Sequence, residues 1–221
     1  MVLVDLDGTM VDSAPDLGYC IDTLLPVLGL PPQGEERVRK WVGNGIERFL
    51  HRALTNSLDG TADPELYAKA WPLFTELYAA NTSTRSYVYP GVREGLDALS
   101  KLGFPLACVT NKPTRFALPL LEHLGLASYF RLVVAGDTLP HKKPDPTPLF
   151  FAANHFQKPA EHCLMVGDSV NDVLAARAAR FSIICVSYGY NHGNDIRTSG
   201  PDAVIDSLTE LTQVFTQVIV D

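Results

Sequence analysis

The sequence predicts an α/β fold in which a doubly wound parallel sheet, a Rossmann-like core, carries an inserted block of helices. Beyond residue 87, short continuous apolar runs alternate with segments that have helical spacing. Continuous apolar runs are typical of strands buried on both faces, as in a parallel sheet covered by helices on each side. One more such run opens the chain, and the block between it and residue 87 shows helical patterns without a convincing strand.

Five strands are expected, at residues 1–5, 104–109, 132–135, 163–166 and 183–186. Leucine stripes at spacings of three and four predict the helices between them, and Gly125 is a suitable end for the helix that precedes it. A last stripe predicts a helix near the C-terminus, carried by Leu208, Leu211, Phe215 and Val218. Strands that alternate with helices in this way are typical of a layered α/β domain.

The inserted block begins with a helical stripe that ends at Gly29, and further helical patterns cover residues 35–41, 46–57 and 64–80. The returning segment, residues 87–92, carries turn residues suited to a linker. We therefore expect a core domain formed by residues 1–13 and 87–221, and a helical cap domain formed by residues 14–86.

Composition excludes several classes of function. The 221 residues carry a net charge of −7 without a Lys/Arg-rich run, so a nucleic-acid partner is not expected. No stretch approaches the roughly 20 apolar residues that span a bilayer. A carboxylate at position 5 interrupts any signal-peptide apolar region, and the four cysteines are expected to be buried thiols. The sequence thus indicates a cytoplasmic protein without a membrane partner, either a monomer or a homodimer.

Reactive side chains follow four of the predicted strands. Open α/β sheets bind ligands at the carboxyl ends of their strands, so these side chains are expected to meet at one edge. Any single aspartate there is commonly just a helix cap. Four strand ends that together supply acids, a hydroxyl, an amide and lysines indicate one reaction site instead. Its members are Asp5, Asp7, Thr110, Asn111, Lys112, Lys142, Lys143, Asp168 and Asp172.

Four motifs follow one another along the chain: Asp5-Leu6-Asp7-Gly8-Thr9, Val109-Thr110-Asn111, Lys143-Pro144 and Gly167-Asp168-Ser169-Val170-Asn171-Asp172. In this order they resemble the motifs of the haloacid dehalogenase superfamily, and the resemblance covers the whole chain. The inserted helices resemble the small helical cap of that superfamily, and residues 28–31 and 38–45 resemble its bacterial phosphoglycolate phosphatase branch.

The resemblance implies a phosphatase in which Asp5 is the nucleophile and Asp7 the general acid and base. A carboxylate nucleophile divides a very slow hydrolysis into two easier steps through an aspartyl-phosphate. Asp5 and Asp168 would bind Mg²⁺ through their carboxylates, and Asp7 through its backbone carbonyl. Hard oxygen ligands of this kind suit Mg²⁺ as the cofactor.

The remaining motif residues are expected to hold the phosphoryl group. Thr110, Asn111 and Lys143 would bind its oxygens, and Lys143 would also place a positive charge beside the nucleophile. Asp172 would orient Lys143 or a metal-bound water. Lys142 is a rival for the role of Lys143, but the Lys-Pro pair favours Lys143. Lys112 is interpreted as a solvated side chain.

In the cap, the turn Gly43-Asn44-Gly45 resembles the family's substrate-specificity loop. The alternative interpretation is an ordinary turn between helices. Arg48 is interpreted as a surface residue, and residues 191–194 as a surface loop that could border the site. The expected reaction is the conversion of 2-phosphoglycolate, a small phosphorylated metabolite, to glycolate and phosphate in carbohydrate metabolism. The alternatives are a sugar phosphomutase of the β-phosphoglucomutase type, a pyrophosphatase of the same family, and a non-catalytic binding protein.

Overall fold

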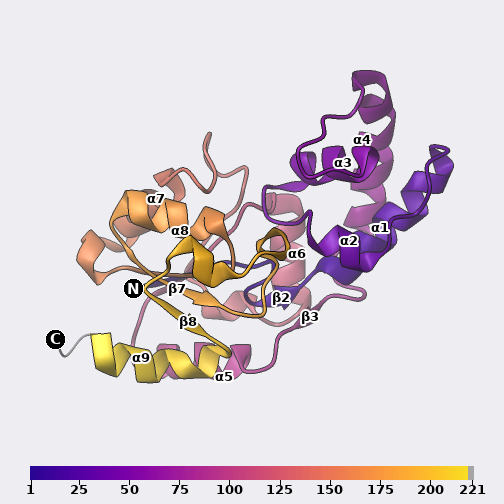
Figure 1. Ribbon diagram of the computed structural model, residues 1–221. Coiled ribbons are helices and arrows are strands. Elements are labelled where there is room, and N and C mark those ends of the chain that lie inside the picture. The colour runs from indigo at the N-terminus through magenta and orange to yellow at the C-terminus, as the bar shows by residue number, and fades with distance from the viewer. Residues whose placement is uncertain (219–221) are drawn as a thin grey trace.

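The computed structural model describes residues 1–218, with side chains described as far as residue 214 (Figure 1). Its main sheet has six strands in the order β5-β4-β1-β6-β7-β8, and every neighbouring pair is parallel. The predicted α/β fold is confirmed. The strands are β1 (Val2–Val4), β4 (Leu106–Val109), β5 (Leu132–Val134), β6 (Leu164–Gly167), β7 (Ser182–Val186) and β8 (Ala203–Ile205).

The central strand β1 shows why the apolar runs are continuous. Val2 and Val4 pack into a hydrophobic cluster on one face of the sheet, while Leu3 packs into a second cluster on the other face. Helices α5 (Val92–Lys101), α6 (Thr114–His123) and α9 (Leu211–Val218) belong to the first face. Helices α7 (Thr147–Phe156) and α8 (Val170–Ala179) cover the second, as Figure 1 shows above the sheet.

Two strand predictions need correction. The edge strand β8 was not expected, because it is only three residues long and its first two residues are partly exposed. The strand predicted at residues 104–109 begins at Leu106, since Pro105 has no N–H to donate to a ladder. In the predicted C-terminal stripe, Leu208 and Leu211 are buried. The side chains of Phe215 and Val218 lie outside the described residues.

The inserted block forms four helices, which we call the cap helices: α1 (Ala14–Val27), α2 (Glu35–Arg39), α3 (Ile46–Thr55) and α4 (Pro64–Ala79). They share a hydrophobic cluster, which also includes Phe116 of α6 and Tyr190, and in which Phe49 and Phe74 have ring centres 5.8 Å apart. Figure 1 shows them to one side of the sheet. The predicted helices are confirmed, whereas the domain boundaries near residues 13 and 87 stay a prediction. Within residues 1–218, no helix combines the length and the apolar character needed to cross a membrane.

The two linkers between the sheet and the cap helices form a small antiparallel pair, β2 (Val11–Asp12) and β3 (Tyr87–Val88). This pair was not predicted, because two-residue strands are too short to show a period. Asp12 accepts hydrogen bonds from Arg39 of α2 at 3.0 and 2.7 Å, and from the hydroxyls of Tyr87 and Tyr190 at 2.8 Å. The linkers are therefore bonded to each other, to a cap helix and to the loop after β7.

Candidate active site

Lys143 stands beside the predicted nucleophile at the carboxyl end of β1. Its Nζ lies 2.9 Å from Oδ1 of Asp5 and 2.7 Å from Oδ1 of Asp172, and it donates to the carbonyl of Val109 at 2.6 Å. Burial alone disfavours the ammonium, but the charges of Asp172 and Asp5 outweigh burial and raise the pKa of Lys143. Lys143 is therefore a permanent positive charge within hydrogen-bonding distance of Asp5.

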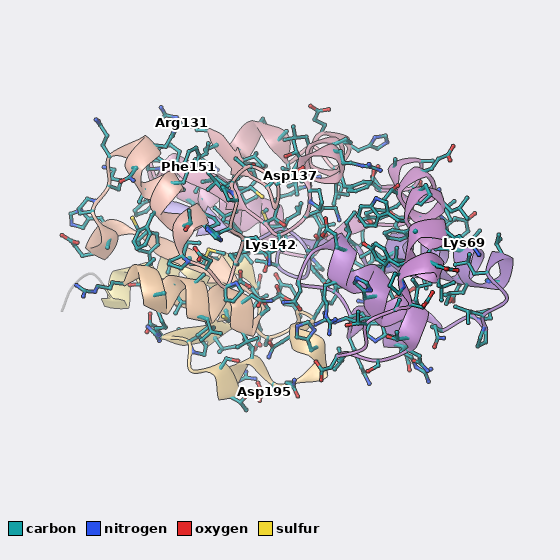
Figure 2. The ribbon with its side chains drawn as sticks, turned by 90° about the horizontal axis from the view of Figure 1, so that it is seen from above. Lys69, Arg131, Asp137, Lys142, Phe151 and Asp195 are labelled. Atoms are coloured by element: carbon teal, nitrogen blue, oxygen red, sulfur yellow. The ribbon has the colours of Figure 1, made fainter. Side chains whose placement is uncertain are left out.

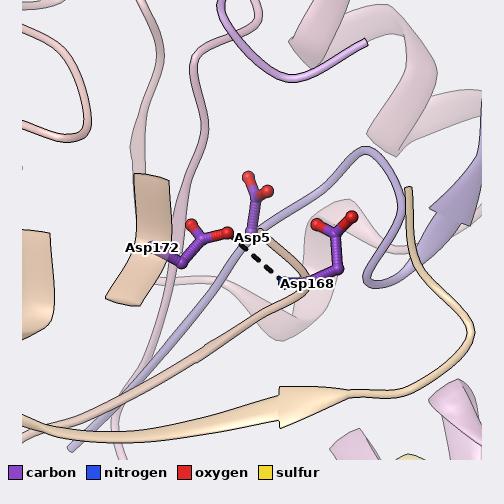
Figure 3. A group of neighbouring side chains, drawn as sticks. All are labelled: Asp5, Asp168 and Asp172. Carbon is purple, nitrogen blue, oxygen red and sulfur yellow. Dashed lines mark hydrogen bonds between the residues drawn. The ribbon is translucent and has the colours of Figure 1, made fainter. Parts of the chain in front are cut away.

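Three carboxylates gather at this end of the sheet, and Lys143 pairs with two of them, Asp5 and Asp172. Oxygens of Asp5, Asp168 and Asp172 all lie within 4.8 Å of one another (Figure 3). Burial raises the pKa of Asp5 to about 7, and the charges of Asp172 and Asp7 add to the effect against that of Lys143. Burial, followed by the charges of Asp5 and Asp172, also raises the pKa of Asp168 well above its ordinary value. This excess of negative charge on oxygen ligands fits a hard divalent cation such as Mg²⁺.

Asp168 is held in place by close approach of the backbone. Gly8 has φ +87°, and a Cβ there would lie 2.4 Å from Oδ2 of Asp168. A Cβ on Gly189 would lie 2.1 Å from the Cβ of Asp168. Asp168 accepts hydrogen bonds from the N–H of Tyr190 at 2.7 Å and from the hydroxyl of Thr9 at 3.1 Å. Only glycine fits at positions 8 and 189, which explains the Asp-Gly-Thr order of the first motif.

Both carboxylate oxygens of Asp172 accept hydrogen bonds from the protein. Its Oδ2 accepts from the N–H groups of Asp168 and Ser169 and from the hydroxyl of Ser169, as part of a capping box at the start of α8. Its Oδ1 accepts from Lys143. This arrangement supports the predicted role of Asp172 in orienting Lys143.

The interpretation of Lys112 as solvated was wrong. Its side chain is 1% exposed, and its Nζ lies 2.9 Å from Oδ1 of Asp7. The same ammonium donates to the hydroxyl of Tyr78 on α4. Lys112 points inward from the loop after β4, and α4 covers it. A local pattern around residue 112 could not reveal this, since the covering helix lies far away in the chain.

Of the two residues after β4, Asn111 connects the core to the loop between α2 and α3. Thr110 and Asn111 are both buried. The Asn111 amide donates to the carbonyls of Gly43 at 3.0 Å and Lys143 at 2.8 Å. Its Oδ1 is buried without a hydrogen-bond partner among the described residues, so it is free to accept from a ligand.

A cavity of about 30 Å³ lies between the sheet edge and the cap helices. On this measure one water needs roughly 10–15 Å³, so the cavity has room for about two or three waters. Asp5, Asp7, Thr110, Asn111, Lys112 and Lys143 line it from the core. The cap helices contribute apolar side chains and glycines: Leu17, Val42, Gly43, Gly45, Ile46 and Phe49.

In the predicted specificity loop, Gly43 and Gly45 line the cavity, while Asn44 turns away from it. The Asn44 amide donates to Oδ1 of Asn171 at 3.2 Å, and its Oδ1 accepts from Arg52 at 2.8 Å. Asn171 in turn donates to the carbonyl of Gly43 at 3.3 Å. The loop is thus bonded to core residues. Arg48 donates to backbone carbonyls within the cap block and does not reach the cavity.

Sequence reasoning missed Ser13, Tyr78 and Tyr190. The Ser13 hydroxyl donates to Oδ1 of Asp7. The Tyr190 hydroxyl accepts from the N–H groups of Ser13 and Ala14. The loop predicted at residues 191–194 does border the site, because Asn191 is buried and accepts from the N–H of Val170 at 3.0 Å. The sequence signal for Ser13 and Tyr190 was weak, because each is only a polar residue next to a predicted linker or strand end.

Fold and site together define a class of α/β protein whose acids and lysine gather at the carboxyl edge of a parallel sheet, beneath a helical insert. A family model described as a haloacid dehalogenase-like hydrolase matches residues 1–180. The chain belongs to this family.

Named relatives agree along nearly the whole chain. Phosphoglycolate phosphatase of Nitrosococcus oceani is 56% identical over 217 residues, which cover 98% of this chain and 96% of that protein. The phosphoglycolate phosphatase of Nitrosospira multiformis is 46% identical, with coverage of 96% and 94%. A crystal structure of a predicted phosphoglycolate phosphatase from Haemophilus somnus 129PT superimposes with a TM-score of 0.91 at 34% identity, covering 97% of this chain and 96% of that one. The predicted family and enzyme class, a phosphatase of the haloacid dehalogenase type, are confirmed.

Proposed function

We propose that this protein is a Mg²⁺-dependent phosphatase that hydrolyses a small phosphorylated metabolite, 2-phosphoglycolate, to glycolate and phosphate. The contact between Lys143 and Asp5, beside Asp168 and beneath a small cavity, is the observation that carries the proposal. The relatives that bear the name phosphoglycolate phosphatase support the choice of substrate.

In the first step, an oxygen of Asp5 bonds to phosphorus while the bond from phosphorus to the leaving oxygen breaks. Asp7 donates a proton to that oxygen, so glycolate leaves as an alcohol. Lys143 offsets the charge of the approaching phosphoryl group, and the Thr110 hydroxyl and the backbone amide of Asn111 donate to its oxygens. Mg²⁺, held by Asp5, Asp168 and the carbonyl of Asp7, would supply the further positive charge that two anions need in order to meet.

In the second step, water attacks the phosphorus of the aspartyl-phosphate and the bond to Asp5 breaks. Asp7 accepts the proton of that water, which returns it to its starting state. Lys143 remains beside the Asp5 carboxylate as it reforms. Asp172 holds Lys143 in this position throughout, because it bonds to the ammonium at 2.7 Å.

The cap side of the cavity favours a short leaving group. Leu17, Val42, Ile46 and Phe49 bring apolar surface, and the glycines at 43 and 45 leave backbone N–H groups accessible to a small anion. The proposed leaving group, glycolate, is short, whereas a sugar would bring many more atoms to this side of the cavity.

A substrate panel tests the proposal. Purified protein with Mg²⁺ is given 2-phosphoglycolate, glucose 1-phosphate, pyrophosphate and other small phosphate esters, and both inorganic phosphate and the organic product are measured. We expect the highest kcat/KM with 2-phosphoglycolate, and no phosphate release by Asp5→Asn although its circular dichroism matches wild type. Conversion of glucose 1-phosphate to glucose 6-phosphate without free phosphate would establish a mutase instead. Turnover that survives thorough chelation of Mg²⁺ would contradict the metal requirement.

A further inference from the structure

Lys112 is a buried lysine for which the mechanism above has no role. Unlike Lys143, which lies between two carboxylates, Lys112 contacts a single carboxylate, that of Asp7, at 2.9 Å. Its side chain is 1% exposed, and its Nζ donates to Oδ1 of Asp7 and to the hydroxyl of Tyr78. A buried lysine is therefore held against the residue expected to move protons.

The contacts of Asp7 define which of its oxygens can carry a proton. Lys112 Nζ and Ser13 Oγ both donate to Oδ1. No residue whose side chain is described donates to Oδ2, and Asp7 lines the cavity. Two donors on one oxygen fix the plane of the carboxylate and leave the other oxygen to hold the proton and face the ligand.

Tyr78 fixes Lys112 from the cap side. It is fully buried on α4, with its ring 5.7 Å from that of Phe74 and 4.9 Å from that of Phe116. Its hydroxyl accepts from Lys112 Nζ, which also lies 5.0 Å from the centre of the Tyr78 ring. Because the ring cannot move without disturbing two aromatic neighbours, the hydroxyl is a fixed support for the ammonium.

We propose that Lys112 is a positioning residue for Asp7, and that Tyr78 of the cap helices holds Lys112 in place. The proposal rests on the phosphatase function proposed above. As the bond from phosphorus to the leaving oxygen breaks, its electron pair stays on that oxygen, which takes the proton from Oδ2 of Asp7. Lys112 keeps Oδ2 aimed at the leaving oxygen, so a cap tyrosine supports the acid of the core.

Leaving groups that differ in their need for a proton test this role. Ethyl phosphate and 2-phosphoglycolate must release an alkoxide unless it is protonated, whereas 4-nitrophenolate leaves 4-nitrophenyl phosphate without a proton. We expect Lys112→Met to lower kcat/KM about 100-fold for both alkyl esters and less than about fivefold for 4-nitrophenyl phosphate. The ratio of the two values does not depend on how much of the preparation is folded.

Tyr78→Phe supplies a second, milder variant, because it removes only the hydroxyl. We expect its ratio of alkyl to aryl kcat/KM to fall about three- to tenfold. Tyr67→Phe and Lys69→Met are matched controls on the same helix, and neither residue lines the cavity. Figure 2 shows Lys69 on the outer side of the cap helices. Both controls should keep the wild-type ratio.

Equal losses on all three esters in Lys112→Met would overturn the proposal, because they would indicate a general structural role. A loss confined to 2-phosphoglycolate would also overturn it, since Lys112 would then bind the substrate carboxylate. Wild-type protein that hydrolyses none of the three esters would contradict the proposed phosphatase function itself. These outcomes differ in which esters lose activity and in which variant. Failure of the Lys112 proposal can therefore be distinguished from failure of the proposed phosphatase function.

Discussion

The ammonium of Lys143 lies 2.9 Å from Oδ1 of Asp5, and within residues 1–218 it is the one cation paired with that carboxylate. We expect Lys143→Met to lower kcat at least about 100-fold, because a fixed positive group beside the reacting atoms typically contributes about 10²–10³ to kcat. Phosphate release from 2-phosphoglycolate measures the effect.

Lys142→Met is the matched control for that variant. Lys142 is the neighbouring residue, its side chain is 40% exposed, and it pairs with Glu47 at 3.5 Å. Figure 2 shows it near the middle of the molecule, between the core and the cap helices. Wild-type activity in Lys142→Met alongside loss in Lys143→Met is the expected result. The reverse result would assign the phosphoryl contact to Lys142.

Asp168→Asn should stabilise the metal-free protein while removing its response to Mg²⁺. The carboxylate is buried next to Asp5 and Asp172, so neutralising it relieves repulsion. Each kcal/mol gained would raise Tm by about 2–4 °C for a chain of this size. Thermal unfolding in EDTA and in Mg²⁺ measures both effects. Asp195→Asn, at an exposed position, is the control, and its Tm should match that of wild type in both buffers. A Mg²⁺-dependent rise in Tm that persists in Asp168→Asn would exclude Asp168 as a ligand.

The pKa of Asp5, about 7 in the metal-free fold, predicts how stability depends on pH. An unfolded aspartate has a pKa of about 3.9, so between these two values the folded state binds more protons than the unfolded state. The free energy of unfolding should therefore fall as pH rises from about 4 to 7 in EDTA. Asp5→Asn should flatten this part of the Tm profile.

Mg²⁺ affinity, measured by calorimetry, should rise over the same pH range, because the metal needs the ionised carboxylate. An affinity independent of pH would contradict this.

The hydrogen bonds of Asn44 predict a variant that weakens the contact between the cap block and the core without changing the chemical step. Asn44→Ala removes the links to Asn171 and Arg52 but leaves every motif residue intact. Only the bond to Asn171 joins the cap block to the core, and its loss, worth about 1 kcal/mol, would raise KM roughly fivefold with a smaller change in kcat. Asn154→Ala, on the exposed side of α7, is the control. A drop in kcat with unchanged KM would instead place Asn44 in the chemical step.

The core of the site could be predicted because parallel sheet topology brings strand ends together, whatever the details of packing. Asp5, Thr110, Lys143 and Asp168 each follow a strand or its loop, and the structure gathers them at one edge. Lys112 could not be predicted, since its burial depends on Tyr78, which lies 34 residues earlier and reaches it only after the cap helices fold over the loop.

Similar reasons explain what was missed in the linkers. Tyr190 lies 22 residues from Asp168, and its support of the site depends on where the loop after β7 turns. The pairing of Val11 with Val88 joins segments separated by the entire helical insert. Contacts of this range leave no periodic signal, because neither segment is long enough to show one.

The antiparallel pairing of β2 with β3 has a mechanical consequence. Two independent tethers would let the cap helices twist, tilt and shift in several directions, but two tethers bonded to each other behave as one joint. Asp12 and Arg39 fasten that joint to α2 by two hydrogen bonds. Any movement of the cap helices must then turn, bend or separate this one pair instead of two separate linkers. A distance across the molecule, such as that between labels at positions 69 and 195, would report such a movement.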